Sequence, residues 1–298
     1  VLFVYNCNPL STIPDQTRVR RGLERTDLFT VVFDAVATDT VAYADVVLPA
    51  TTFLEHDDLS RGYGATILAR VRPVIAPVGE ACSNTEVFAE LCRRLDLARP
   101  GDPETPDALI DALIGAHTNG GSHADEIARS LAGEGIAVTA PVPFIDTFPA
   151  TSDAKIHLLP PELDAEAPAG LYGYQPDPST PAFPLALISP ARTSTISSTF
   201  GQLDRTLARL IVHPADAEPR GIAEGDTVRV WNATGEVRCL ARLSDEIRAG
   251  VVSLPKGLWR HHTLDGNTAN ALVPDALADL GGGATFNDAR VEVERIAQ

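Results

Sequence analysis

Apolar runs alternate with polar and amphipathic stretches over the first 99 residues. Runs at 1–5, 28–34 and 44–48, and an extended one at 65–74, predict strands. Residues 15–25 predict a short helix, and a longer helix is predicted from Ser83, which forms an S-x-x-E capping box with Glu86. Strands that alternate with helices are typical of a largely parallel α/β sheet. We expect the longer helix to bury one apolar face on that sheet as core: Val87, Phe88, Leu91, Cys92 and Leu95.

The pattern changes between residues 100 and 182. Two short amphipathic helices are predicted at 106–116 and 122–132, and a stretch rich in proline follows, including Pro141, Pro143, Pro168 and Pro176. Proline interrupts helices and central strands. We therefore expect a connector that packs over a neighbouring surface.

The last third, residues 183–298, is predicted to be mostly β. Strands are expected at 184–189, 207–213, 251–256 and 289–296, with a short helix in 213–226 that ends near Gly221. Residues 227–243 predict a hairpin whose turn, 232–235, contains Asn and Gly. A small barrel closes so many short strands without leaving exposed edges. The predicted organisation is an α/β parallel-sheet region at 1–99, a connector at 100–182 and a mostly-β domain at 183–298.

Composition narrows the function classes. The chain has 298 residues, enough for more than one domain, and a net charge of −16, which disfavours binding to nucleic acid. No apolar run is long enough to cross a bilayer. The sequence begins inside an apolar run and contains no methionine, so we expect a fragment that lacks its N-terminal part.

Metal binding by side chains of this chain is not expected. The four cysteines, Cys7, Cys82, Cys92 and Cys239, are far apart and form no C-x-x-C pair. His261 and His262 are adjacent, and adjacent side chains on a strand point to opposite faces. The acidic stretch 55–58 is interpreted as a solvated loop and structural link.

The most informative segment is residues 28–58. An apolar strand ends at Asp34 and is followed by Thr38, Asp39 and Thr40, and ligands of open α/β sheets bind beyond the carboxyl ends of strands. For Asp34 alone, an ordinary turn explains the pattern equally simply. The threonines are as consistent with helix capping as with ligand contact.

Three motifs together make the chain resemble a known family. They are NCNP at 6–9, the segment TDT…ADVVLPATTFLEHDD at 38–58, and the terminal blocks 213–237, TANAL at 268–272 and DLGGGATFND at 279–288. Over nearly its whole length the chain resembles the C-terminal part of the molybdopterin oxidoreductases of the dimethyl sulfoxide reductase type, which include formate dehydrogenases and nitrate reductases. The resemblance implies that the mostly-β domain is a double-psi β-barrel like that of aspartate decarboxylase.

The same resemblance implies a cofactor and its contacts. The cofactor is bis(molybdopterin guanine dinucleotide) carrying molybdenum or tungsten. An aspartate carboxylate accepts hydrogen bonds from guanine N1–H and N2–H₂ together, and Asp34 matches the family's acidic residue. In the barrel, Arg192 and neighbouring hydroxyls would hold a pyrophosphate or the pterin edge. The candidate contacts are Asn6, Asn8, Asp34, Thr38, Thr40, Arg192, Thr193, Ser197, Ser198, Thr199, Asn270 and Asn287, and Trp231 and Trp259 are assigned to packing.

The implied reaction is a two-electron redox step at the metal. No residue of this chain is predicted to be catalytic, because the protein ligand of the metal and any [4Fe-4S] cluster would lie upstream. The implied partners are the N-terminal domains of the same chain and an electron-transfer subunit. The cytoplasm is the expected compartment, with the periplasm as the alternative because an export signal would lie in the missing part.

Two other functions fit parts of the sequence. One is a structural subunit of a respiratory complex that has lost the cofactor, which the joint presence of Asp34, Arg192 and Asn270 disfavours. The other is a nicotinamide dehydrogenase, which the lack of a G-x-G-x-x-G motif after a strand disfavours.

Overall fold

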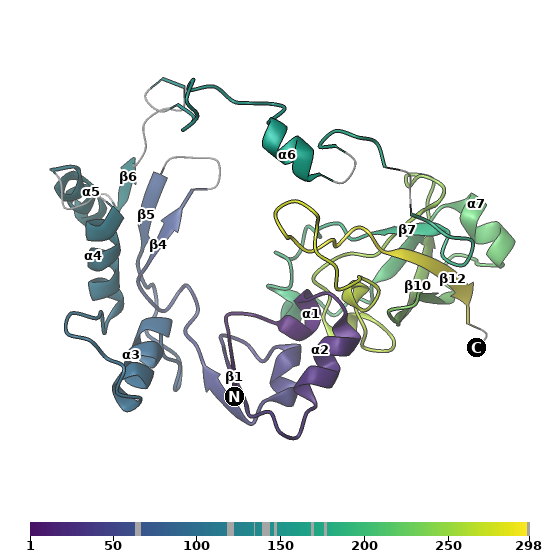
Figure 1. Ribbon diagram of the computed structural model, residues 1–298. Helices are drawn as coiled ribbons and strands as arrows, with labels where there is room; N and C mark the ends of the chain where they lie inside the picture. Colours follow the sequence, from purple (N-terminus) through teal and green to yellow (C-terminus); the bar gives the residue numbers. More distant parts are fainter. Residues whose placement is uncertain are drawn as a thin grey trace. The chain divides into compact units, whose positions relative to one another are not determined.

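A computed structural model of the chain describes residues 1–62, 67–117, 122–133, 135–138, 144–145, 148–167, 170–175 and 178–296 (Figure 1). They form two compact units. Unit 1 comprises 1–32, 37–47 and 159–298, and unit 2 comprises 33–36 and 48–158. This division differs from the predicted ranges 1–99, 100–182 and 183–298, because helices after residue 100 pack with strands from the first range. Pro141, Pro143, Pro168 and Pro176 of the predicted connector lie outside the described residues.

The first 50 residues form a three-stranded sheet with short helices. Its order is β1 (Leu2–Tyr5), β2 (Thr30–Asp34) and β3 (Val46–Pro49). The N–H groups of Asp45 and Ala50 donate to the carbonyls of Thr30 and Asp34, so β2 and β3 run parallel as predicted. Between the strands lie α1 (Pro9–Thr12), α2 (Gln16–Leu23) and a 3₁₀ helix η1 (Asp39–Tyr43).

The C-terminal part of unit 1 is a closed barrel, which confirms the predicted closure. Around the barrel the order is β10-β8-β11-β7-β12-β9. The pairs β8–β10 and β7–β11 are parallel, and the other four are antiparallel. Its strands are β7 (Leu185–Ile188), β8 (Arg209–Val212), β9 (Thr227–Trp231), β10 (Glu236–Leu243), β11 (Val251–Ser253) and β12 (Arg290–Arg295). The double-psi assignment stays a prediction.

Short helical turns connect the barrel strands. Helix α7 (Pro214–Ala217) continues into η3 (Glu218–Arg220) and ends at Gly221, where the sequence predicted an end. Three further 3₁₀ helices are η2 (Gly201–Leu203), η4 (Arg260–His262) and η5 (Ala269–Ala271). Helix α6 (Pro161–Glu166) precedes the barrel.

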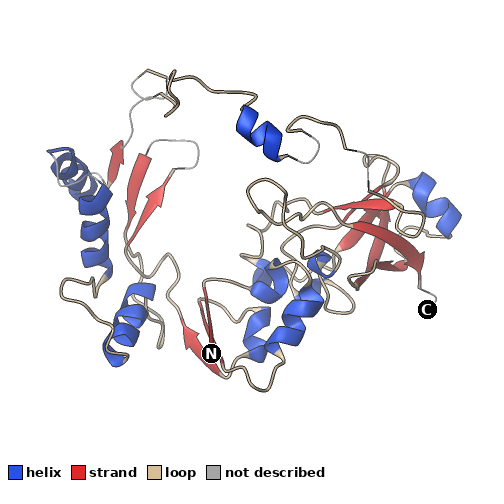
Figure 2. Cartoon of the chain, in the orientation of Figure 1, coloured by secondary structure: helices blue, strands red, loops and turns tan. Residues whose placement is uncertain are grey.

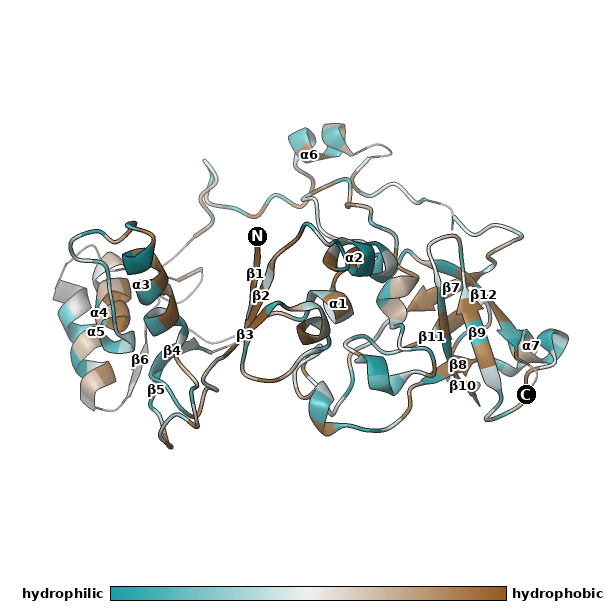
Figure 3. Ribbon diagram, turned by 90° about the horizontal axis from the view of Figure 1, so that it is seen from below, coloured by the Kyte–Doolittle hydropathy of each residue, from teal (hydrophilic) through white to brown (hydrophobic). Residues whose placement is uncertain are grey.

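The barrel interior follows from period-two alternation along its strands (Figure 3). Val228 and Val230 of β9 are fully buried, as are Val237, Cys239 and Ala241 of β10. Burial raises the pKa of the Cys239 thiol to about 12, so this side chain is an inert core group.

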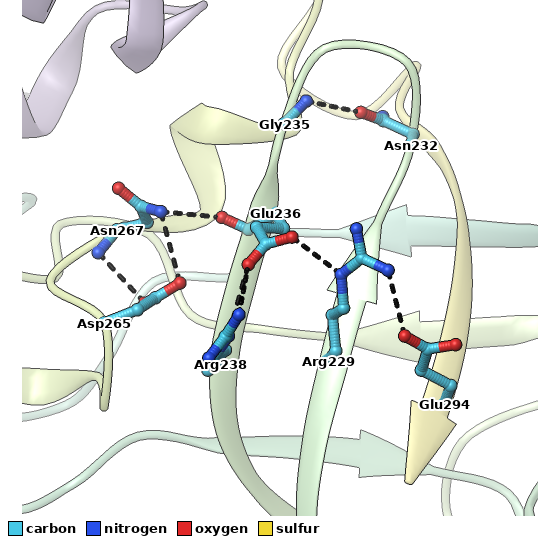
Figure 4. Close-up of polar contacts among 8 residues, drawn as sticks. All are labelled: Arg229, Asn232, Gly235, Glu236, Arg238, Asp265, Asn267 and Glu294. Atoms are coloured by element: carbon cyan, nitrogen blue, oxygen red, sulfur yellow. Dashed lines mark hydrogen bonds and ion pairs between the residues drawn. The ribbon is translucent and has the colours of Figure 1, made fainter. Parts of the chain in front are cut away.

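The outer face of the barrel carries a charge ladder (Figure 4). Arg229 and Arg238 lie opposite each other on β9 and β10, and Glu236 accepts from both, at 2.7 Å and 3.0 Å. On the other side Arg229 donates to Glu294 of β12 at 2.9 Å. Glu236 therefore offsets the repulsion between the two cross-strand arginines.

The described residues of unit 2 form the helices α3, α4 and α5 and an antiparallel sheet (Figure 2). The sheet order is β4 (Asp58–Arg61), β5 (Ile67–Val71) and β6 (Ile136–Val138). Helices α4 (Pro106–His117) and α5 (Ser122–Gly133) lie where amphipathic helices were predicted. Their buried isoleucines and leucine pack with Leu59 and Leu68 of the sheet. The prediction that α4 and α5 belong to a connector is therefore wrong, because an amphipathic pattern does not show which surface the apolar face packs against.

Helix α3 (Asn84–Arg94) begins at Ser83 with the predicted capping box, since Ser83 accepts from the Glu86 N–H and Glu86 accepts from the Ser83 N–H. The prediction that its apolar face is core is wrong for this chain. No residue of α3 is fully buried, and the exposed fraction of Leu95 is 64%. Helical spacing places these side chains on one face of α3. Their burial depends on whether another surface packs against that face.

Within the part of the chain that the structure describes, no helix is both long and apolar enough to cross a bilayer.

Candidate functional site

Two of the predicted contact residues, Asn8 and Thr40, meet in the interior of unit 1. The Thr40 hydroxyl donates to Asn8 Oδ1 at 2.9 Å and accepts from the Leu10 N–H at 3.3 Å. Both side chains are buried. Thr40 is thereby used by the protein itself, whereas Asn8 Nδ2 is buried without a hydrogen-bond partner among the described residues.

Asn270 joins the same region through Asp39 and Ser11. The Asn270 amide donates to the Ser11 carbonyl at 2.8 Å, and the Ser11 hydroxyl donates to Asp39 Oδ2 at 2.9 Å. The same carboxylate oxygen accepts from the Arg260 N–H at 2.8 Å. Asp39 therefore links α1 to the barrel segment 259–262. Sequence reasoning used the neighbouring threonines of the TDT motif and missed this aspartate.

Helix α2 fixes the loop that carries Asn270. Fully buried Gln16 donates to the Leu10 carbonyl and accepts from the Thr268 N–H, both at 2.8 Å. Arg20 donates to Asn267 at 2.7 Å. Residues 16–20 and 267–270 are thus held together although they lie at opposite ends of the chain.

Thr38, Asp34 and Asn6 lie in three different settings. Thr38 occupies the N-cap position of η1, but its side chain makes no capping bond, and its buried hydroxyl has no partner in the described part of the chain. The capping interpretation is therefore wrong for Thr38, whereas the Thr40 hydroxyl accepts from the Leu10 N–H in the first turn of α1. Asp34 ends β2 and accepts from the Ala35 N–H at 2.8 Å. Asn6 is exposed, with φ of 50°.

The second group of predicted contacts lies in residues 192–204, here named the hydroxyl loop. Arg192 forms an ion pair with Asp204, and their side chains are 18% and 16% exposed. The Thr206 N–H and the Arg192 charge lower the pKa of Asp204. Arg192 was expected to be available for a ligand phosphate, but its Nη2 is already paired; Nη1 is buried and lacks a partner among described residues.

The hydroxyl loop rests on the segment 257–262. The Trp259 indole N–H donates to the Ser198 carbonyl at 2.7 Å. Fully buried His262 accepts from the Trp259 N–H at Nδ1, at 2.8 Å, so its Nε2–H donates to the Asp204 carbonyl at 3.1 Å. His261 Nε2 also lies 2.8 Å from that carbonyl. Trp259, assigned to packing from the sequence, therefore also makes a specific polar contact.

The remaining predicted residues are more exposed. Thr193, Ser197 and Thr199 of the hydroxyl loop have exposed side chains, and Ser198 is partly buried. Asn287 is exposed, and its Oδ1 accepts from the Ser189 N–H at 3.1 Å at the end of β7. Asn287 thus has a structural role in addition to any ligand contact.

Buried polar atoms without protein partners test whether the implied cofactor fits these residues. In the described residues, Asn8 Nδ2 and Thr38 Oγ1 are two such atoms in the N-terminal part, where Arg20 Nε and Thr30 Oγ1 are others. Arg192 Nη1 and Thr195 Oγ1 are two such atoms in the hydroxyl loop, which also contains Gln202 Oε1. Buried donors are normally satisfied. Two nitrogen donors and two hydroxyls match the oxygen-rich phosphates and riboses of a dinucleotide, so the residues present fit the group. Thr195 was missed because the loop contains several Ser and Thr residues, and the sequence does not show which of their hydroxyls is buried.

The acidic stretch of unit 2 is structural. Glu55 is buried, which contradicts its interpretation as part of a solvated loop. It accepts from the N–H and hydroxyl of Thr52 and from the Val78 N–H, each at 2.7 Å, and these bonds lower its pKa. Asp57 pairs with Arg70 at 2.9 Å. Among the described residues no group of three His, Cys, Asp or Glu side chains is arranged to hold a metal ion.

Two domain families match the chain. The family described as molybdopterin oxidoreductase matches residues 1–94, and the family described as molydopterin dinucleotide binding domain matches residues 190–290. The second match contains the hydroxyl loop, the segment 257–262 and Asn270.

Relatives and a solved structure agree with these matches. YoaE, a probable oxidoreductase of Bacillus subtilis, is 33% identical over 99% of this chain and 44% of its own length. Biotin sulfoxide reductase of Cereibacter sphaeroides is 30% identical over 85% of this chain and 38% of its own length. Acetylene hydratase from Pelobacter acetylenicus shares the fold, with a TM-score of 0.79 and 19% identity over 99% of this chain and 44% of that one. The chain spans less than half the length of each.

Proposed function

Because the chain belongs to the molybdopterin oxidoreductases of the dimethyl sulfoxide reductase type, we propose that it binds the nucleotide part of a bis(molybdopterin guanine dinucleotide) cofactor. The observation that carries the proposal is that four of the predicted or neighbouring contact residues of unit 1, Asn8, Thr38, Arg192 and Thr195, have buried polar atoms without a partner among the described residues. Other such atoms in unit 1 include Arg20 Nε, Thr30 Oγ1 and Ser189 Oγ. A ligand that accepts from the donors of the four contact residues would remove the cost of leaving them unsatisfied.

The proposed contacts divide by chemistry. Asp34 accepts from the guanine N1–H and N2–H₂ groups. Asn8 and Thr38 donate to ribose or phosphate oxygens, and Arg192 with Thr195 holds a pyrophosphate or the pterin edge. Asn270 is held by the Ser11 carbonyl and Thr40 by the Asn8 side chain, so their main effect is to fix the surrounding segments in place. The other predicted contacts, Asn6, Thr193, Ser197, Ser198, Thr199 and Asn287, remain proposals at the rim of the site.

The whole protein is proposed to be an oxidoreductase. When bound, the cofactor supplies two-electron redox chemistry at molybdenum or tungsten. The residues of this chain bind and orient the nucleotide, and their carboxylates and hydroxyls do not enter the redox step. A metal-ligating residue, an iron–sulfur cluster and an electron-transfer partner are proposed for the remainder of the protein and its complex.

The test uses the full-length protein purified from a host that synthesises the cofactor. Asp34→Asn keeps one acceptor oxygen but replaces the other with an NH₂ group that opposes one guanine donor, and it removes the negative charge, so bound guanine nucleotide should fall at least about tenfold. Guanine nucleotide released by acid is measured by chromatography, and molybdenum and tungsten by mass spectrometry.

The matched control is Asp111→Asn, an exposed aspartate of α4. It should keep the wild-type nucleotide content. Full nucleotide content in Asp34→Asn would refute the role of Asp34. A folded wild-type protein with neither metal nor guanine nucleotide would refute the cofactor proposal and favour the structural-subunit alternative.

A further inference from the structure

The hydroxyl loop has a backbone conformation that it cannot hold by local preference alone. Ser197 and Phe200 adopt positive φ angles, 51° and 70°, which residues with a side chain rarely do. Within the loop, two backbone hydrogen bonds pair Ile196 with Thr199, and the N–H groups of Gly201 and Leu203 donate to the carbonyls of Ser198 and Phe200. External contacts are needed to keep this conformation.

The segment 257–262 supplies those contacts at close range. Trp259 is 5% exposed, and its indole N–H donates to the Ser198 carbonyl at 2.7 Å. A Cβ on Gly201 would lie 2.3 Å from the indole Nε1, and a Cβ on Gly257 would lie 1.9 Å from the Ser197 carbonyl oxygen. Two positions without side chains therefore allow the loop backbone to lie directly against Trp259 and its neighbours.

Ser198, which accepts the Trp259 hydrogen bond, lies in the sequence between residues of the loop whose polar groups have no partner. Arg192 Nη1 and Thr195 Oγ1 precede Ser198 in the chain, and Gln202 Oε1 follows it; all three are buried and have no partner within the described residues. A shift of the loop backbone at Ser198 would displace the side chains of Arg192, Thr195 and Gln202. The Ser198 carbonyl is held by the Trp259 indole N–H at 2.7 Å and by the Gly201 N–H at 3.2 Å, and of these two bonds only the first comes from outside the loop.

We propose that Trp259 is a positioning residue of the nucleotide site. Its indole N–H fixes the Ser198 carbonyl and so holds Arg192, Thr195 and Gln202 in the arrangement that receives the ligand. This inference rests on the proposed function, because positioning the loop's polar groups has a purpose only if a ligand binds to them. It adds Gln202 to the proposed contacts and gives Trp259 a role that packing alone does not require.

Trp231, the second of the chain's two tryptophans, provides the contrast. Its ring packs edge-on against Phe183, with centroids 5.3 Å apart, and under the Arg229 guanidinium at 5.0 Å. Its Nε1 has no hydrogen-bond partner in the described part of the chain. Replacement of Trp231 by Phe removes a similar volume but no polar contact, so it is a matched control.

The experiment compares Trp259→Phe with Trp231→Phe in the full-length protein, purified from a host that cannot make the cofactor. Guanosine diphosphate is the probe, titrated by calorimetry. Loss of one hydrogen bond should weaken binding about two- to tenfold in Trp259→Phe only. Trypsin cleavage after Arg192 and Arg205, at the two ends of the loop, should accelerate in Trp259→Phe, while the melting temperatures of the two variants stay alike.

Equal nucleotide affinity in the two variants would overturn the positioning role. If Trp259→Phe does not fold, Gly257→Ala asks the same question from the other side, since its Cβ must displace the Ser197 carbonyl; a folded Gly257→Ala protein with wild-type affinity would also overturn it. A wild-type protein that neither binds guanosine diphosphate nor carries guanine nucleotide when made in a cofactor-producing host refutes the proposed function instead. The two failures are therefore distinguishable.

Discussion

At the scale of single residues, the chemical type of a side chain does not show whether its polar atoms are available to a ligand. Arg192 was predicted as a ligand contact from its type and its hydroxyl neighbours, but Asp204 already pairs with one of its nitrogens. Thr40 is likewise committed to Asn8 and to the Leu10 N–H. The polar atoms that can bind a ligand are those that the fold leaves without hydrogen-bond partners.

His262 gives a pH prediction at this scale. Burial, with the nearby charges of His261 and Arg192, lowers its pKa from the ordinary 6.5. Below about pH 6.5 the unfolded chain binds a proton at this ring that the folded chain excludes, so the free energy of unfolding should fall as pH drops through that range, by at most about 1.4 kcal/mol per pH unit. Above pH 6.5 this contribution is constant. Urea denaturation of the full-length protein between pH 5 and 8 measures it.

The comparison variant for this prediction is His262→Gln, which keeps an N–H for the Asp204 carbonyl but does not titrate. Its stability should be flatter than wild type between pH 5 and 6.5. His261→Gln retains the buried ring and should retain the slope. Parallel curves for wild type and His262→Gln would contradict the assignment of the slope to this residue.

At the scale of elements, the β9–β10 hairpin shows how one side chain joins local and distant structure. Asn232 Oδ1 accepts from the N–H groups of Thr234 and Gly235, which closes the predicted turn (Figure 4). Its Nδ2 donates to the carbonyls of Leu272 and Arg290, at 2.8 Å and 3.1 Å. The turn is local, but its attachment to η5 and β12 requires the folded barrel.

We expect Asn232→Asp to keep the turn and lose its attachment. The carboxylate still accepts from the turn N–H groups, but it cannot donate to the two carbonyls and faces them with negative charge. Two lost hydrogen bonds should lower the free energy of unfolding by about 2–3 kcal/mol, measured by chemical denaturation. Ala233→Ser, at the exposed neighbouring turn position, should change it by less than about 0.5 kcal/mol. Similar values for both variants would show that the two donated bonds contribute nothing.

At the scale of the whole molecule, the two units have separate hydrophobic cores. The barrel core includes fully buried Leu210, and the core of unit 2 is built on buried Ile127 with three other buried side chains. A unit with its own core can open locally without the other.

This separation predicts two independent patterns of hydrogen exchange in the full-length protein. Leu210→Ala should destabilise by about 2–5 kcal/mol and accelerate exchange in peptides from the barrel strands. Ile127→Ala should accelerate exchange in peptides from α4 and α5. Each variant serves as the control for the other, and mass spectrometry of peptides measures both. Acceleration across both units by either variant would mean that they unfold as one.

Elements with local causes were readable from the chain. The capping box of α3 joins residues three positions apart, the β9–β10 turn joins residues three apart, and barrel strands such as β9 alternate with a period of two. The short strands β4 and β6 were missed, although β7 and β8, which are as short as β4, were predicted. The sequences of β7 and β8 are mainly apolar, whereas that of β4 is mostly polar. The prediction that the apolar face of α3 is buried was wrong, because helical spacing does not show which surface packs against that face.

The sequence by itself determined the alternation of strands and helices, the barrel strands and the residue types of a nucleotide-binding surface, because these depend on neighbours within a few positions. Only the tertiary structure decided that Asn270 meets Ser11, 259 positions away, that Asp204 occupies Arg192, and that Trp259 holds the hydroxyl loop. Such contacts join segments that become neighbours only when the chain is packed, and burial then decides which polar atoms are left to bind a ligand.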